Sequence, residues 1–162
     1  MFGISRALQR AEEPRRHVSP SGWMRRDEAI MGTAISVELW SDDGLAGESA
    51  IDAVMQEMHR IDRTMSPHKA DSELSCINRE AGEAPVPISA EMARLLARAN
   101  DFSQLSGGAF DITYAAVGQL YDYRNRIRPD EQTLAQARAA VGYRHLVLDM
   151  RARTVRFARP GM

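Results

Sequence analysis

The chain has 162 residues, of which 44% are hydrophobic and 27% are charged, a composition typical of an ordinary globular domain. The formal net charge is −1 and the isoelectric point is about 6.4, so no overall positive field attracts nucleic acid or an anionic membrane. A single cysteine, Cys76, excludes an internal disulfide and a cysteine-based zinc site. No apolar run approaches the ~18 residues that a membrane-spanning helix requires.

The first 27 residues show no periodicity of a folded element, and we expect them to be a disordered leader. Six arginines lie within residues 1–26 and no apolar stretch follows them, which is not the pattern of an export signal. As written, the sequence therefore predicts a cytoplasmic protein without a membrane segment. We expect the folded domain to span residues 28–162.

The first predicted elements are a strand followed by a long helix. Apolar and polar residues alternate over residues 28–40, as expected for a strand with one buried face. Apolar residues then recur at helical spacing over residues 51–65, which predicts an amphipathic helix that Pro67 ends. Asp71 or Ser72 suits the cap of a short helix, and Ser89 the cap of a second amphipathic helix.

The second half of the chain contains a glycine pair, an arginine-rich loop, a helix and a hairpin. Arg124, Arg126 and Arg128 lie in one short segment, which we interpret as a solvated surface. Asp130 is expected to open a helix that Gly142 caps, and residues 146–149 and 154–157 read as a hairpin. This irregular order favours an α+β fold, a mixed sheet with amphipathic helices.

Three segments carry the functional signal. They are Met31-Gly32-Thr33, the polar loop over residues 65–78 with Asp71-Ser72-Glu73-Leu74-Ser75 inside it, and Gly108-Ala109-Phe110-Asp111-Ile112-Thr113. Taken alone, the glycine pair fits a simple structural turn as well as a close approach to a ligand. Together and in this order, the segments resemble the ApbE family of FAD:protein FMN transferases, and the resemblance covers about residues 28–162 as the amino-terminal half of such a domain.

The resemblance implies an enzyme that takes FAD as its substrate and requires Mg²⁺. It would attach FMN through a phosphoester to a threonine of a target protein and release AMP, which is phosphoryl transfer. The family's later glycine-rich motif and metal ligands are expected beyond Met162. The fold is therefore expected to be incomplete at its carboxyl end and the chain inactive alone. Family members often act in the periplasm, which makes that compartment the alternative to the cytoplasm.

The resemblance also implies a set of flavin-nucleotide contacts, while it leaves the catalytic residues unknown and predicts no metal ligand here. His68 stands where the family commonly has tyrosine, and its imidazole offers less area for stacking. Two other functions stay open: a non-catalytic flavin-nucleotide-binding module, and a FAD pyrophosphatase that hydrolyses FAD to FMN and AMP. The residues implied to contact FAD are Met31, His68, Ala109, Phe110 and Asp111.

Overall fold

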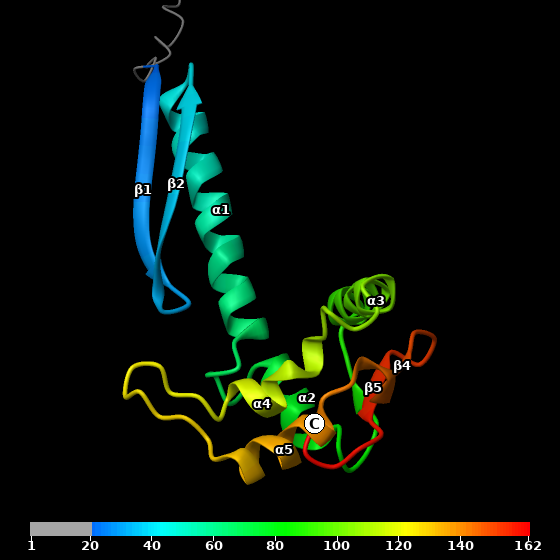
Figure 1. Ribbon diagram of the computed structural model, residues 1–162. Coiled ribbons are helices and arrows are strands. Elements are labelled where there is room, and N and C mark those ends of the chain that lie inside the picture. The colour runs from blue at the N-terminus through cyan, green and yellow to red at the C-terminus, as the bar shows by residue number, and fades with distance from the viewer. Residues whose placement is uncertain (1–20) are drawn as a thin grey trace, which may run out of the picture. The chain divides into compact units, whose positions relative to one another are not determined.

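The computed structural model describes residues 21–162 and divides the chain into two compact units, Met1–His59 and Arg60–Met162 (Figure 1). The expected leader lies for the most part in residues 1–20, outside the described residues. Helices and strands are both present, and the described strands form one sheet of two strands and one of three. The α+β class is confirmed, but both sheets of the described residues are antiparallel, whereas we expected a mixed sheet.

The first unit is built on a hairpin of β1 (Gly22–Ile30) and β2 (Thr33–Ser41). We expected one strand over residues 28–40, but the chain turns at Met31 and Gly32, so only the part after the turn corresponds to β2. Strand β1 begins inside the segment that we assigned to the leader. The sequence of β1 lacks the alternation of apolar and polar residues expected for a strand, because charged residues occupy inward positions. These residues form ion pairs with side chains of α1 (Gly44–Met65). Arg26 pairs with Glu48 at 2.6 Å between Nη2 and Oε2, and also with Asp52.

The core of the first unit lies between the hairpin and the apolar face of α1. Ile30, Ile51 and Met55 are buried there, and the helical spacing of the last two confirms the predicted amphipathic helix. Gly47 on α1 permits close contact between this helix and β1, because a Cβ added at Gly47 would lie 2.4 Å from the sulfur of Met24. The apolar side chains packed around this core are Met24, Ile35, Val37, Leu39 and Met58.

The second unit contains the other helices and the three-stranded sheet. Ser72 and Ser89 cap α2 (Glu73–Glu80) and α3 (Ala90–Leu105) by accepting hydrogen bonds from the first turn. Ser89 was predicted as a cap, and Ser72 was one of two candidates with Asp71. The predicted hairpin is confirmed as β4 (Leu146–Asp149) and β5 (Thr154–Phe157). The short strand β3 (Val86–Pro87) pairs with β5, which gives the strand order β3-β5-β4.

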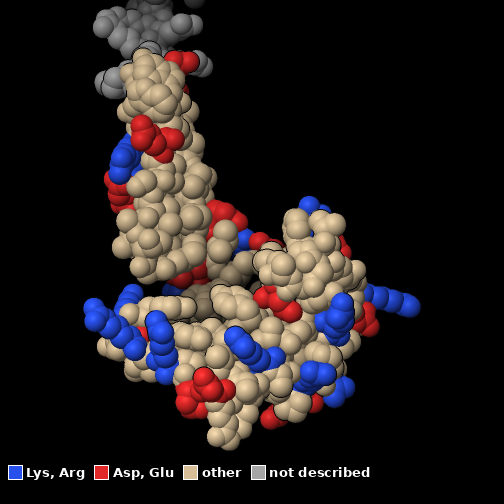
Figure 2. All heavy atoms as spheres, in the orientation of Figure 1, with Lys and Arg blue, Asp and Glu red and all other residues tan. Residues whose placement is uncertain are grey.

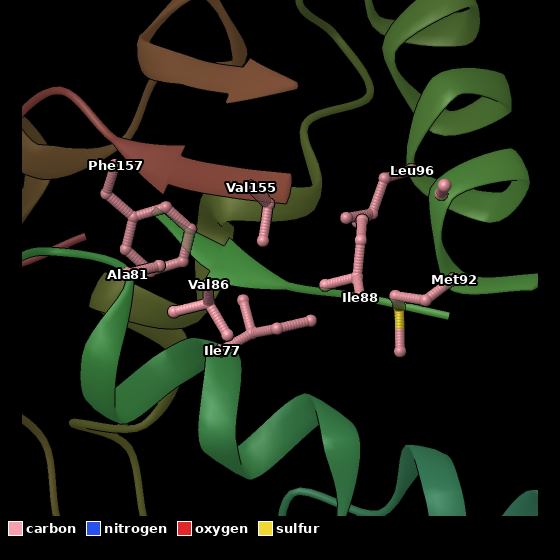
Figure 3. Packing of buried hydrophobic residues seen from close by; sticks show 9 residues of the cluster. Ile77, Ala81, Val86, Ile88, Met92, Leu96, Val155 and Phe157 are labelled. Atoms are coloured by element: carbon pink, nitrogen blue, oxygen red, sulfur yellow. The ribbon is translucent and has the colours of Figure 1, made fainter. Parts of the chain in front are cut away.

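The core of the second unit forms where β5 meets α2, β3 and α3 (Figure 3). Val155, at the centre of the sheet, is fully buried, and Phe157 packs over Ala81. Two distant segments of the chain therefore close one core. Its buried members are Ile77, Ala81, Val86, Ile88, Met92, Ala93, Leu96, Val155 and Phe157.

Short helices connect α3 to β4: η1 (Ile112–Tyr114), α4 (Ala115–Gly118), α5 (Glu131–Ala140) and η2 (Tyr143–His145). Asp130 caps α5 as predicted, but the C-cap is Val141 and the prediction of Gly142 was wrong. Gly142 has a φ of 161°, which is extended backbone and not the left-handed conformation of a glycine cap. Within residues 21–162, no helix is long and apolar enough to cross a bilayer.

Candidate functional site

Met31 lies at the tip of the hairpin in the first unit. Ile30 pairs with Thr33, so Met31 and Gly32 form a two-residue turn, and both have positive φ, 54° and 72°. Such turns favour glycine or asparagine, and a methionine there is strained. Its side chain is 45% exposed. The turn therefore presents an apolar side chain to solvent on a constrained backbone.

His68 lies in the loop between α1 and α2, and its side chain is exposed. The loop is ordered by Ser72, whose hydroxyl donates to the Ser66 carbonyl at 2.6 Å and accepts from the Ser75 amide at 3.0 Å. Lys69 forms an ion pair with Asp62, with 3.1 Å between Nζ and Oδ2. These contacts fix the backbone on both sides of His68 while its imidazole stays accessible to a ligand.

Asp111 connects the loop after α3 to the segment before β4. Its Oδ1 accepts from the amide and the hydroxyl of Thr113, at 2.9 and 2.7 Å, and its Oδ2 accepts from the Tyr143 amide at 2.8 Å. The Thr113 hydroxyl oxygen accepts from the Gly142 amide at 2.8 Å. A carboxylate has about four acceptor positions. Oδ2 therefore keeps room for one more donor.

Phe110 lies at an apolar cavity of about 330 Å³ in the second unit. Its ring is 47% exposed and meets Phe102 edge to face, with 6.4 Å between centroids. The neighbouring Gly108 has a φ of 88°, a conformation that favours glycine and turns the chain ahead of Phe110. Other residues that line the cavity include Met65, Leu74, Leu95, Ile112 and Leu146.

The predicted site residues thus have different surroundings. Of those in the second unit, Phe110 lines the cavity, Ala109 and His68 are exposed, and Asp111 is half-buried in its hydrogen-bond network. Met31 belongs to the first unit. Sequence reasoning placed Thr113 only at the end of a motif, predicted Gly142 only as a helix cap and assigned no role to Tyr143. The long-range hydrogen bonds of Asp111 and Thr113 reveal that the three residues belong to one network.

The second unit therefore combines two features. One is the loop after Gly108, which the carboxylate of Asp111 holds by a hydrogen bond to the Tyr143 amide. The other is an apolar cavity of the size that small ligands occupy. These features define an α+β protein with an apolar cavity in its second unit. The family model of the ApbE family matches residues 31–162. The chain belongs to the ApbE family.

Individual relatives agree with this assignment. The chain is 32% identical over 129 residues to a FAD:protein FMN transferase of Haemophilus influenzae, covering 74% of this chain and 36% of that protein. It is 29% identical over 126 residues to the transferase of Treponema pallidum, covering 76% and 35%. A crystal structure of the ApbE protein of Thermotoga maritima has the same fold, with a TM-score of 0.78 at 22% identity, over 86% of this chain and 46% of that one. The chain thus spans about a third of the length of these curated relatives.

Proposed function

We propose that this chain supplies part of the flavin-nucleotide pocket of a FAD:protein FMN transferase. The observation that supports this most directly is the Gly108–Thr113 loop, held by Asp111 and carrying Phe110 at the apolar cavity. A planar flavin ring is apolar on both faces and stacks on aromatic side chains. The cavity and Phe110 would accept the ring, and the free acceptor position of Asp111 would bind a donor on the nucleotide.

In the proposed reaction, the hydroxyl oxygen of a threonine in the acceptor protein attacks the phosphorus on the FMN side of FAD. The bond from that phosphorus to the bridging oxygen breaks, AMP leaves, and a base takes the hydroxyl proton. The role of this chain's residues is to bind and orient FAD. A rigid loop is suited to that role because orientation lowers the entropic part of the barrier.

Magnesium is the cofactor that this chemistry requires, so the described residues must be compared with its needs. Mg²⁺ prefers several oxygen ligands in near-octahedral geometry. Within residues 21–162, no three acidic, histidine or cysteine side chains converge where they could hold a metal ion. The described residues therefore do not fit a magnesium site, and we assign none of them to it.

The activity can be tested by in-gel flavin fluorescence of a threonine-bearing acceptor protein incubated with FAD and Mg²⁺. We expect residues 1–162 alone to leave the acceptor unlabelled, because residues 21–162 bring together no cluster of metal ligands. The same chain extended to the length of its relatives should label it. Labelling by residues 1–162 alone, or none by the extended chain, would contradict the proposal. Release of AMP without labelling would favour the pyrophosphatase instead.

The role of His68 can be tested separately through FAD binding. If the exposed imidazole stacks on the nucleotide, His68→Tyr should keep or raise the affinity for FAD, because tyrosine offers a larger ring. His68→Ala should weaken it by about 1 kcal/mol, roughly fivefold. Titration followed by FAD fluorescence measures the affinity of the unchanged protein and of both variants for FAD. Equal affinities would rule out a stacking role for His68.

A further inference from the structure

The loop between α4 and α5 is an exposed element that flavin binding does not explain (Figure 1, yellow). Asp122 and Ile127 close it through two backbone hydrogen bonds, at 3.2 and 2.9 Å. The rings of Tyr121 and Tyr123 stack, with 6.0 Å between centroids and 13° between planes. Tyr123 is nevertheless 85% exposed. The loop thus presents an ordered aromatic surface to solvent.

Within the described part of the chain, the arginines of this loop have no acidic partner. Arg124, Arg126 and Arg128 are exposed, and none of them forms an ion pair with any residue of the described chain, 21–162. The carboxylate of Asp122 is used within the loop, where it accepts from the amides of Arg124 and Asn125 at 3.0 Å. In Figure 2, basic side chains lie over this part of the second unit, and others are spread over the rest of the face in view. The positive charge is therefore available to a ligand.

Arg126 has a backbone conformation that is unfavourable for a residue with a side chain. Its φ is 57°, in the left-handed region that glycine enters without steric cost and arginine does not. Glycine would relax this backbone, so the side chain of Arg126 is not explained by the stability of the loop. Strain of this kind concentrates where a side chain has a functional contact to make.

A hollow adjoins the tyrosines. It has a volume of about 450 Å³ and is lined by Tyr121 and Tyr123, by the apolar side chains of Val117 and Val141, and by Arg138. The ring of Tyr114, which is 65% exposed, lies against it as well. An apolar hollow beside unpaired guanidinium groups suits a ligand that carries both apolar and acidic groups.

We propose that this surface binds an acidic, apolar-containing segment of a partner protein. Arginine forks bind carboxylates with two parallel hydrogen bonds, and tyrosine and arginine are the residue types enriched among binding hot spots. The chain has a formal net charge of −1 and so provides no extended positive field for a nucleic acid backbone or an anionic bilayer, whereas a compact basic patch beside an apolar hollow suits a short acidic segment. We call the set the tyrosine–arginine surface: Tyr121, Tyr123, Arg124, Arg126, Arg128 and Arg138.

The proposal concerns a protein partner and is tested without FAD. The probe is a fluorescently labelled peptide of Glu, Asp and Leu, measured by anisotropy at about 0.1 M salt, where the screening length is about 10 Å. The triple variant Arg124→Ser/Arg126→Ser/Arg128→Ser should weaken binding about tenfold or more. The matched control changes three exposed arginines elsewhere in the second unit, Arg94, Arg151 and Arg156, to serine and should weaken it less than about twofold.

Arg126→Gly separates binding from folding. It removes one charge while it relaxes the backbone, so we expect weaker peptide binding together with an unchanged or higher melting temperature. An equal loss of peptide affinity in the triple variant and in its control would overturn the proposal, because the loss would then follow from the change in net charge alone. No peptide binding, or tighter binding of single-stranded RNA or phosphatidylserine vesicles at this loop, would overturn it as well.

Discussion

Replacing Asp111 with alanine is expected to lower the free energy of unfolding by about 2 to 4 kcal/mol, since hydrogen bonds to a charged group contribute about 1.5 to 3 kcal/mol each. The change removes the cap of η1 and the bond to the Tyr143 amide. It leaves that amide and the Thr113 hydroxyl without their acceptor. Urea unfolding followed by circular dichroism measures the loss. Unchanged stability would show that the network contributes nothing to folding.

The same variant is expected to weaken FAD binding by about 1 to 3 kcal/mol, the range for loss of a polar partner. Thr113→Val is the matched control, because it removes the bonds of the hydroxyl to Asp111 and Gly142 but leaves the carboxylate in place. Loss of affinity in Asp111→Ala alone would indicate direct contact with the nucleotide. Similar loss in both variants would indicate that Asp111 only positions the loop. Normal affinity in both would exclude the loop from the flavin site.

Replacing Phe157 with alanine is expected to cost about 3 to 5 kcal/mol of stability, the range for removing a buried aromatic side chain. Phe157 is nearly buried in the core of the second unit, and it lies on β5, the strand that joins β3 to β4. Phe157→Leu should cost only about 1 kcal/mol because it keeps most of the apolar volume.

Leu105→Ala provides the surface control for this experiment. Leu105 is 84% exposed, so its truncation should change stability by less than about 0.5 kcal/mol. Circular dichroism measures the unfolding of both units. Tryptophan fluorescence measures that of the first unit, which contains Trp23 and Trp40. A loss for Phe157→Ala no larger than for Leu105→Ala would contradict the core that the structure shows.

The sequence by itself determined the features that depend on neighbours within a few residues. The amphipathic face of α1, the caps Ser72, Ser89 and Asp130, and the β4–β5 hairpin all follow from local periodicity or local hydrogen bonding. The α+β class follows from their order, and the family resemblance came from three short motifs. The comparisons confirm the family and the class.

Only the tertiary structure decided the features that depend on distant partners. Strand β1 was missed because Arg26 and Glu28 take its inward positions, and their partners on α1 are not recognisable by spacing. Asp111 was predicted as a ligand contact, but its bond to Tyr143 spans 32 residues and gives it a structural role too. Periodicity records which side chains are buried, whereas the partner of a polar group is set by how the chain folds back on itself.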